Sequence, residues 1–482
     1  MLLVTAERPP HAASKPDRAI GALLGLATGD ALGAGYEFAD PPTGDAGMIG
    51  GGLGAWAPGE WTDDTQQAIC VAESGATGAL DGDAVGRRLL EWYAEGPKDV
   101  GNQTRAVLGA ARSGQDLRSA SRAHFDRHPA QSAGNGSLMR TAPVALAHLG
   151  DDEAILEAAF EISGLTHADP VAGEACAIWC IAIDRAVRER RLDGIWDGVD
   201  LLPGDASKRW AGWLLAAQEQ RPSTFTPNGY VVRALQAAWA AIHQTPVPAD
   251  DPCRHLQDAL HAAVRIGDDT DTVAAIAGSL LGARWGASAI PLGWKALLHG
   301  WPGLRARDLT GLAVHATTHG LDDEVGWPGA SDLSEWYRHE YGHEPFVVAL
   351  PDDPGVLLGN AAAAATVECD VMVSLCRMGT AVPTGAGVQH ELRLIDAPHP
   401  AHNPNLDFVL RDTASTIGAW RDDGRSVFVH CVAGVSRTPT VASAYLASRL
   451  GIDGSSALDR VREVHPRAHP NAGFLEALAK IR

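Results

Sequence analysis

The chain has 482 residues, of which 45% are hydrophobic and 20% charged, and its formal net charge is −20 at pH 7. Such a composition predicts a globular protein of two or three domains, and the acidic balance argues against duplex nucleic acid or an anionic membrane as a partner. Seven cysteines without a regular framework, no signal peptide and no apolar run of membrane-spanning length predict a reducing, cytoplasmic location.

The first two-thirds of the chain has the pattern of an all-α domain, predicted over residues 17–320 after a flexible leader at 1–16. Apolar residues at helical spacing predict a first helix at 17–27, followed by a small-residue turn at 29–33. A Gly-rich loop at 47–60 then leads into further helices. These are predicted at 83–94, 154–162, 171–190, 210–220, 230–243, 253–265 and 272–285.

The pattern changes after an aromatic, Pro/Gly-punctuated linker at 321–344. Short β-rich runs then alternate with helical stretches, which predicts an α/β domain with a mostly parallel sheet over residues 345–482. Strands are predicted at 345–350, 355–359, 370–376, 390–395 and 426–430, and helices at 361–365, 406–420 and 438–450.

Two acidic clusters of the same residue types stand out in the helical part. The first is Thr62-Asp63-Asp64-Thr65, and the second runs from Asp268 to Thr272. Either cluster alone is typical of a helix N-terminus, with a capping side chain and carboxylates facing the positive end of the helix dipole. Because the pair recurs, the sequence also predicts two half-sites that converge on a hard divalent cation.

Three further polar groups lie between or before the clusters: Glu37, the Gly134-Asn135-Gly136-Ser137 turn, and His167. Each has an ordinary explanation, as a surface carboxylate, a turn and a buried histidine. It is the ordered series of motifs that carries information. The series is GDALGAGYEF at 29–38, WTDDT at 61–65, DVGNQT at 99–104, GNGSLMRTAP at 134–143, THADP at 166–170 and DDTDT at 268–272.

With these motifs, residues 17–315 closely resemble the ADP-ribosylglycohydrolases, the family of dinitrogenase-reductase-activating glycohydrolase and the ADP-ribosyl-acceptor hydrolases. The resemblance implies an all-helical fold with a binuclear Mg²⁺ or Mn²⁺ centre that hydrolyses the glycosidic bond of ADP-ribosylated substrates. It further implies Glu37 as an acid/base. The implied metal ligands are Thr62, Asp63, Asp64, Asp269, Asp271 and Thr272, and the implied ADP-ribose-binding residues are Gly101, Asn135, Gly136, Ser137 and His167. Asp268 stands where many members have glycine and is left out of the ligand set.

A second site is predicted where an apolar strand ends in His430-Cys431 and Arg437-Thr438 follows after a five-residue loop. The loop N–H groups and the next helix would surround an anion and lower the cysteine pKa, and Arg437 could hold two phosphate oxygens. A buried cysteine in an ordinary β–α turn is the less favoured interpretation. The predicted phosphate-binding residues are Val432, Ala433, Gly434, Val435, Ser436 and Arg437.

Residues 345–482 resemble the cysteine-dependent phosphatases, nearest to the dual-specificity type. The resemblance implies Cys431 as the nucleophile that forms a phosphocysteine, Arg437 as the phosphate ligand and Thr438 as a residue that stabilises the thiolate, with no cofactor. The family's general acid lies upstream of the cysteine, which favours Asp396. Asp407 and Asp412 are alternatives that fall in a predicted helix.

The sequence therefore predicts a bifunctional hydrolase, acting on an ADP-ribosylated protein or small ADP-ribosyl compound and on a phosphorylated protein or small phosphomonoester. An alternative is a protein that binds ADP-ribose or a phosphorylated ligand, with only one domain catalytically active. A third hypothesis is a structural metalloprotein in which the acidic clusters are helix caps.

Overall fold

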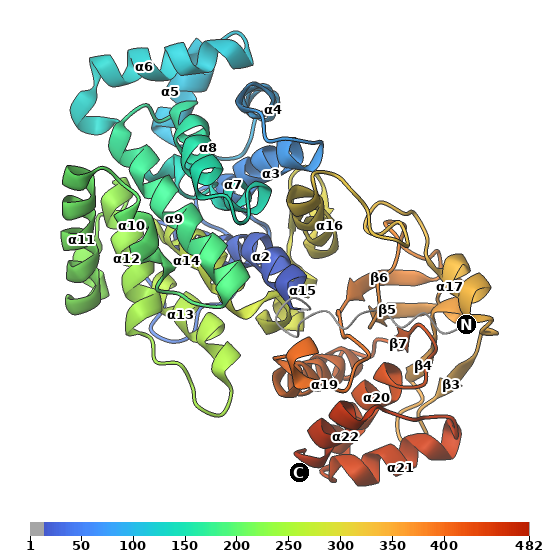
Figure 1. Ribbon diagram of the computed structural model, residues 1–482. Helices are drawn as coiled ribbons and strands as arrows, with labels where there is room; N and C mark the ends of the chain where they lie inside the picture. The colour runs from blue at the N-terminus through green and yellow to red at the C-terminus, as the bar shows by residue number, and fades with distance from the viewer. Residues whose placement is uncertain (1–13, 482) are drawn as a thin grey trace. The chain divides into compact units, whose positions relative to one another are not determined.

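The computed structural model describes residues 14–481, so the predicted leader falls almost wholly outside the described residues. The chain divides into two compact units (Figure 1). One comprises residues 16–290 and 297–321 and is helical. The other contains residues 291–296 and 322–482 and holds a five-stranded sheet. This confirms the predicted fold classes. Within residues 14–481, none of the helices has the length and apolar character needed to cross a bilayer.

The helical unit contains a helix at each predicted range, although several begin or end at other residues, and it holds further helices for which no range was predicted. They are α2 (Lys15–Gly33), α3 (Asp63–Ala76), α4 (Gly82–Ala94), α5 (Asn102–Ala110), α6 (Leu117–Arg127), α7 (Ala142–Ala147), α8 (Asp152–Gly164), α9 (Pro170–Glu189), α10 (Gly194–Asp200), α11 (Gly204–Glu219), α12 (Val231–Gln244), α13 (His255–Val264), α14 (Thr270–Trp285) and α16 (Ala306–Thr318). A two-stranded ribbon joins β1 (His299–Gly300) to β2 (Leu304–Arg305).

Helix α2 differs from the prediction in one respect that bears on function. The segment 29–33, predicted as a turn, is the last part of α2, so Asp30 lies inside a buried helix. Small residues let α2 pack directly on α14: a Cβ at Gly25 would lie 2.2 Å from the carbonyl oxygen of Gly278, and one at Gly33 would lie 2.5 Å from the Cα of Asp271. This backbone contact brings Asp30 and Asp271 to the same region.

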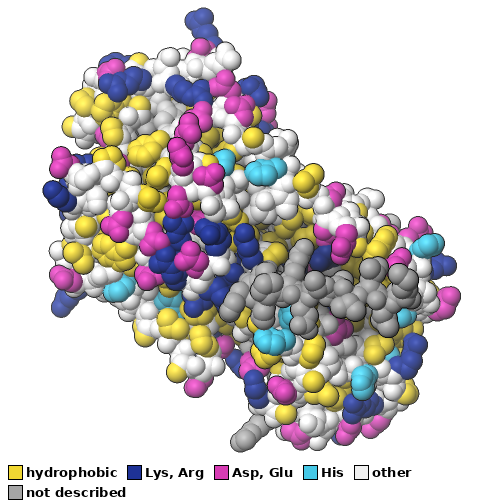
Figure 2. Space-filling model, in the orientation of Figure 1, with side chains coloured by type: hydrophobic (Ala, Val, Ile, Leu, Met, Phe, Trp, Pro, Cys, Tyr) yellow, Lys and Arg dark blue, Asp and Glu magenta, His cyan; other side chains and the backbone are white. Residues whose placement is uncertain are grey.

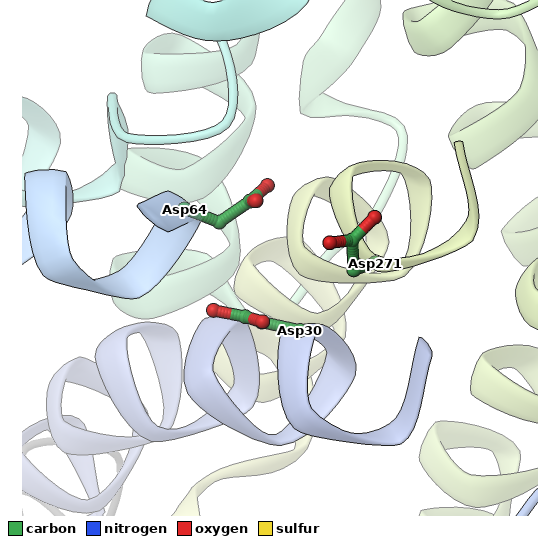
Figure 3. A group of neighbouring side chains, drawn as sticks. All are labelled: Asp30, Asp64 and Asp271. Atoms are coloured by element: carbon green, nitrogen blue, oxygen red, sulfur yellow. The ribbon is translucent and has the colours of Figure 1, made fainter. Parts of the chain in front are cut away.

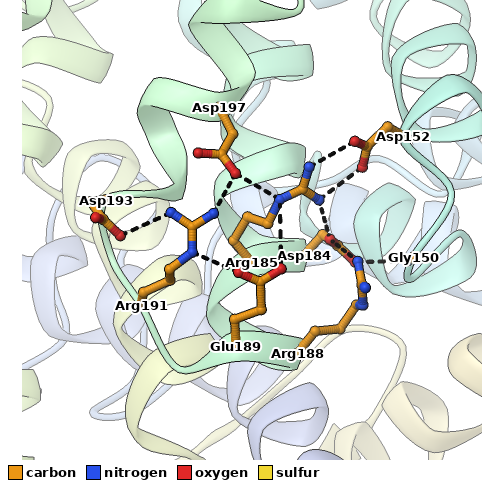
Figure 4. Close-up of polar contacts among 9 residues, drawn as sticks. All are labelled: Gly150, Asp152, Asp184, Arg185, Arg188, Glu189, Arg191, Asp193 and Asp197. Atoms are coloured by element: carbon orange, nitrogen blue, oxygen red, sulfur yellow. Dashed lines mark hydrogen bonds and ion pairs between the residues drawn. The ribbon is translucent and has the colours of Figure 1, made fainter.

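A dense ion-pair network ties α8, α9 and α10 together on the helical unit (Figure 4). The buried Arg185 donates to both carboxylate oxygens of Asp152, at 2.8 and 2.7 Å, and to Asp197 at 2.9 Å. Asp184, which is fully buried, accepts from Arg185 at 2.6 Å and from Arg188 at 3.0 Å. On the face shown in Figure 2, acidic and basic side chains lie among one another.

The sheet of the second unit has the order β3-β4-β7-β5-β6, in which only the β3–β4 pair is antiparallel. Figure 1 shows α19 to α22 gathered beside this sheet. The elements are β3 (Val347–Ala349), β4 (Val356–Asn360), β5 (Cys369–Ser374), β6 (Ala386–Glu391), β7 (Val427–Cys431), α15 (Leu292–Leu297), α17 (Ser334–Tyr341), α18 (Ala361–Ala364), α19 (Leu406–Asp422), α20 (Arg437–Leu450), α21 (Gly454–Val464) and α22 (Ala472–Ala479).

The central strand β7 is buried at every position, as expected for a strand flanked on both sides by parallel partners. It delivers Cys431 to the carboxyl edge of the sheet, where the helix α20 begins after a short loop. The predicted strand at 390–395 is shifted: β6 ends at Glu391, and the apolar residues Leu392 and Leu394 are buried in the loop that follows.

Candidate functional sites

Carboxylates from three helices converge in the helical unit. Asp30 of α2, Asp64 of α3 and Asp271 of α14 point toward one another, and their carboxylate oxygens lie within 4.8 Å of each other (Figure 3). A second group of the same kind is formed by Glu37, Asp269 and Asp271. Because Asp271 belongs to both groups, the two acidic clusters of the sequence meet at one place.

Burial makes this cluster unfavourable without a counter-charge. Burial, followed by the neighbouring carboxylates, raises the pKa of Asp63, Asp64 and Asp271 well above the ordinary range. The pKa of Glu37 rises to about 9 for the same two reasons, with Asp269 its strongest charged neighbour. Burial raises the pKa of Asp30 to about 6. Divalent cations would relieve this repulsion.

The hydrogen bonding of the Asp64 carboxylate also fits a bound cation. Asp64 uses one carboxylate oxygen to accept from the Thr62 hydroxyl at 3.0 Å, whereas its buried Oδ1 has no hydrogen-bond partner within residues 14–481. A buried carboxylate oxygen without a donor is costly unless another group, such as a metal ion, occupies that position. This oxygen belongs to a carboxylate of the cluster, and its lack of a donor fits a metal centre.

Thr62 is also the N-cap of α3, since its hydroxyl accepts from the Asp64 N–H at 3.5 Å. The helix-cap interpretation and the metal interpretation are therefore compatible. Asp63 lies beside the cluster, with Oδ2 accepting from Gln67 at 2.9 Å. Thr272 is buried at the start of α14, where its hydroxyl contacts the sulfur of Met139 at 3.9 Å.

Asp30 is the residue that sequence reasoning missed. Its carboxylate accepts from the backbone N–H groups of Thr62 and Thr65 and from the Thr65 hydroxyl, at 2.5 to 3.1 Å. Asp30 therefore fixes the start of α3 while contributing to the cluster. The available signal was a carboxylate at position 30, after a long stretch of apolar and small residues in which a charge is costly.

Asp268 has a positioning role in this arrangement. Its carboxylate accepts from the Asn228 N–H at 2.7 Å, and its carbonyl accepts from the Phe38 N–H at 2.8 Å, next to Glu37. Asn228 in turn accepts from the Asp269 N–H at 2.9 Å. Asp268 also has a left-handed backbone, with φ of 67°, where glycine would be less strained.

The residues predicted to bind ADP-ribose are distributed around the cluster. Asn135 donates to Asp269 at 2.7 Å, and a Cβ at Gly136 would lie 3.2 Å from the His167 ring. Gly101 is exposed at the start of α5, and its N–H donates to Asp63. Ser137 is buried, and its hydroxyl accepts from Ser163 at 2.8 Å, which directs it into the interior.

The second site surrounds Cys431, which is buried at the end of β7. The Gly434 N–H points at the Cys431 sulfur at 3.3 Å, and Gly434 has a left-handed φ of 74°. A Cβ there would lie 2.5 Å from the Phe346 ring, so glycine is required on both counts. The five loop residues 432–436 thus curl in front of the sulfur, as expected for an anion-binding loop.

Arg437 begins α20 and is held beside this loop. Its Nη1 donates to the carbonyls of Leu375 and Leu394 at 2.9 and 3.2 Å. Among the described residues its buried Nε has no hydrogen-bond partner, and it forms an ion pair at 3.8 Å with a carboxylate oxygen of Asp396. A buried guanidinium N–H that makes no hydrogen bond at this end of the loop is suited to an incoming phosphate oxygen.

Asp396 lies in the loop after β6 and reaches the same place. Its Oδ1 accepts from the Ser436 hydroxyl at 2.7 Å and from Asn471 at 2.8 Å. Asn471, at the cap of α22, was not predicted and carries no local sequence signal. The alternative acids Asp407 and Asp412 both lie in α19; Asp407 pairs with Lys480, and Asp412 accepts from the Leu292 N–H.

Two further residues flank the Cys431 loop in the sequence, His430 before it and Thr438 after it. His430 is buried and bonds to the Ser374 hydroxyl at 2.7 Å, and burial lowers its pKa to about 3. The Thr438 hydroxyl donates to the carbonyl of Gly359 at 3.4 Å. Its predicted effect on the thiolate therefore stays a prediction.

Comparisons with known proteins identify the family that each part of the chain matches. Residues 11–324 match the family described as ADP-ribosylglycohydrolase, and residues 387–482 match the family described as dual specificity phosphatase, catalytic domain. A carboxylate-lined helical domain is thus joined to an α/β domain of the cysteine phosphatase class. The chain belongs to the ADP-ribosylglycohydrolase family and also carries a dual specificity phosphatase catalytic domain.

Among similar proteins, ADP-ribosylarginine hydrolase Tri1 of Pseudomonas putida is 32% identical over 320 residues, covering 60% of this chain and 81% of the relative. The ADP-ribosyl-dinitrogen reductase glycohydrolase of Rhodospirillum rubrum is 29% identical over 294 residues, covering 58% and 90%. Dual specificity protein phosphatase 12 of Mus musculus is 36% identical over 170 residues, covering 34% of this chain and 46% of the relative.

Proposed function

We propose that the protein is a bifunctional hydrolase that cleaves the glycosidic bond of ADP-ribosylated substrates and hydrolyses phosphomonoesters through a phosphocysteine. The observation that carries the first activity is the convergence of the buried carboxylates of Asp30, Asp64 and Asp271. The second rests on the Gly434 N–H that points at the Cys431 sulfur and on the Arg437 guanidinium at the end of the same loop. We assign these to domains at 17–320 and 345–482, with a linker at 321–344.

In the first domain, Asp30, Asp64, Asp269 and Asp271 would hold Mg²⁺ or Mn²⁺, with Asp63 and the hydroxyls of Thr62 and Thr272 beside them. When bound, two such cations polarise ribose hydroxyls and lower the pKa of water. Glu37 borders the cluster and is the group suited to move a proton between water and the leaving group. Asn135, Gly136 and His167 would bind the ADP-ribose from the opposite side.

An ADP-ribosylated arginine side chain is the first acceptor to test, because two similar proteins are named as ADP-ribosylarginine hydrolases. A guanidinium leaving group needs only modest help from an acid once the ribose is held and water is activated. The net charge of −20 also suits approach of a protein surface rich in arginine, with no duplex nucleic acid or membrane as partner.

In the second domain, the Cys431 thiolate would attack the phosphorus atom, and the bond from phosphorus to the ester oxygen would break. Asp396 would give its proton to that leaving oxygen and then take one from the water that hydrolyses the phosphocysteine. Arg437 and the N–H groups of the loop 432–436 would bind the phosphate oxygens during both steps. This domain needs no cofactor.

We also propose a cytoplasmic location, supported by the seven cysteines, all of which are buried thiols. A reducing compartment would keep Cys431 available for chemistry.

Mass spectrometry of the products tests the two activities separately. Wild-type protein with Mn²⁺ should release ADP-ribose from an ADP-ribosylarginine protein and phosphate from an aryl phosphate. Asp271→Ala should lose only the first product and Cys431→Ser only the second. If the wild type bound ADP-ribose tightly by calorimetry but released none from arginine, serine or ester substrates, the first domain would be a binding module instead.

A further inference from the structure

Arg140 is a buried cation that bonds both to Gln67, next to the carboxylate cluster, and to Thr166, next to His167. It follows the Asn135–Ser137 turn and has no exposed surface. Burial lowers its pKa to about 10, so the guanidinium still carries its charge at neutral pH. Its terminal nitrogens point in two directions: Nη1 donates to Gln67 at 2.6 Å, and Nη2 donates to Thr166 at 2.6 Å.

The first hydrogen bond connects Arg140, through Gln67, to the carboxylate of Asp63. Gln67 lies one turn after Asp63 on α3, and its Oε1 accepts from Arg140. The amide NH₂ must then face Asp63, where it donates to Oδ2 at 2.9 Å. The reverse orientation would place NH₂ against the guanidinium and the amide oxygen against the carboxylate, which are both repulsive pairs. Arg140 therefore fixes which atom of Gln67 meets Asp63.

The second hydrogen bond connects Arg140, through the Thr166 hydroxyl, to the ring of His167. The Thr166 hydroxyl accepts from Arg140, and its own proton is left for the His167 Nδ1, which lies at 2.8 Å. Burial lowers the pKa of His167 to about 3, so the ring is neutral and carries one proton. With Nδ1 as the acceptor, that proton is on Nε2. In this tautomer Nδ1 accepts the proton of the Thr166 hydroxyl, which itself accepts from Arg140.

The Nε2–H of His167 lies against the glycine turn that follows Ala133. A Cβ at Gly134 would be 3.3 Å from Nε2, and one at Gly136 would be 3.4 Å from it. The same turn carries Asn135, which bonds to Asp269. A neutral N–H donor among glycines at this place suits a phosphate or ribose oxygen of ADP-ribose.

We propose that Arg140 is a positioning residue that sets both the Gln67 amide and the His167 tautomer, and so supports the carboxylate cluster and the ADP-ribose pocket with one side chain. The proposal deepens the proposed function and rests on it for the identity of the ligand. The tautomer itself does not depend on any activity.

Nitrogen NMR of the metal-free, full-length chain, labelled at histidine, measures the tautomer directly, with His167→Gln giving the assignment. We expect the Nε2–H form in the wild type and in Thr166→Ser, which keeps the hydroxyl. We expect loss of that preference in Thr166→Val, which has the same shape without the hydroxyl. A wild-type ring protonated at Nδ1 would overturn the proposal.

Calorimetry with Mn²⁺, and with ADP-ribose at saturating Mn²⁺, separates the two directions. Gln67→Leu should weaken Mn²⁺ binding about tenfold and leave ADP-ribose affinity unchanged, and Thr166→Val should do the reverse. Arg140→Met should weaken both, and Thr166→Ser neither. The proposal is overturned if folded Arg140→Met keeps both affinities.

If Arg140→Met does not fold, unchanged ADP-ribose affinity and tautomer in Thr166→Val overturn the proposal instead. If the wild type bound neither Mn²⁺ nor ADP-ribose, the proposed function would fail, and the NMR result would still decide the tautomer.

Discussion

The carboxylate of Asp30 accepts a 2.5 Å hydrogen bond from the hydroxyl of Thr65 and a 3.0 Å bond from its N–H. The last turn of α2 is thereby fixed to the first turn of α3, and the Asp30 carboxylate is held beside Asp64. Stability and metal binding thus depend on the same side chain.

Replacing Asp30 should affect both properties. Asp30→Ala leaves the buried N–H groups of Thr62 and Thr65 without an acceptor, at about 1–3 kcal/mol each. Asp30→Asn keeps the shape but removes the charge, and should weaken Mn²⁺ binding at least about tenfold. Urea unfolding in EDTA and Mn²⁺ titration measure the two effects. The exposed Asp40→Asn is the control, and equal behaviour of the two Asn variants would contradict the assigned role.

The metal-free protein should lose stability as the pH rises. The folded-state pKa values of Asp30 and Glu37 are raised from 3.8 to about 6 and from 4.5 to about 9, so the folded state binds more protons than the unfolded state. The stability that these protons contribute is fully present below about pH 4 and is lost through about pH 6 for Asp30 and pH 9 for Glu37. Saturating Mn²⁺ should reduce this slope, because ionised carboxylates are then the favoured form.

Thermal melts between pH 5 and pH 9, with EDTA and with Mn²⁺, measure this difference. Parallel pH profiles with and without the metal would contradict a cation site at the carboxylate cluster.

In the ion-pair network of α8, α9 and α10, the buried Asp184 should contribute much more to the free energy of unfolding than the exposed Asp193. Asp184→Ala removes a fully buried carboxylate that the buried Arg185 shares with the more exposed Arg188, and should lower the free energy of unfolding by about 3–5 kcal/mol. Asp193→Ala removes a carboxylate with 70% side-chain exposure and should cost less than about 1 kcal/mol. Similar urea midpoints for the two variants would show that burial does not decide their contributions.

Substrates whose leaving groups differ in their need for a proton should identify the general acid of the phosphatase domain. Asp396→Asn should lower kcat by about 10²–10⁴-fold for an alkyl phosphate, whose leaving oxygen needs a proton, and much less for a nitrophenyl phosphate. Asp407→Asn, on the surface of α19 with Lys480, should change neither rate. A larger loss for Asp407→Asn than for Asp396→Asn would reassign the acid.

Local patterns in the sequence were sufficient for most of the helices, the parallel sheet and the residues of the Cys431 loop. They failed at Asp30 because glycines and alanines at 29–33 are equally typical of a turn, and only packing of α2 on α14 makes them helical. Contacts over long sequence separation, such as Asn228 with Asp268 or Asn471 with Asp396, have no local signature. Their geometry depends on packing of the whole unit.

The most direct test of the account is Mn²⁺-dependent release of ADP-ribose from an ADP-ribosylarginine protein by wild type and Asp271→Ala. Asp271 belongs to both carboxylate groups, so its loss should lower kcat/KM at least about a hundredfold while Cys431→Ser keeps the wild-type value. Equal rates for the wild type and folded Asp271→Ala, or release unaffected by EDTA, would contradict a catalytic metal centre at this cluster.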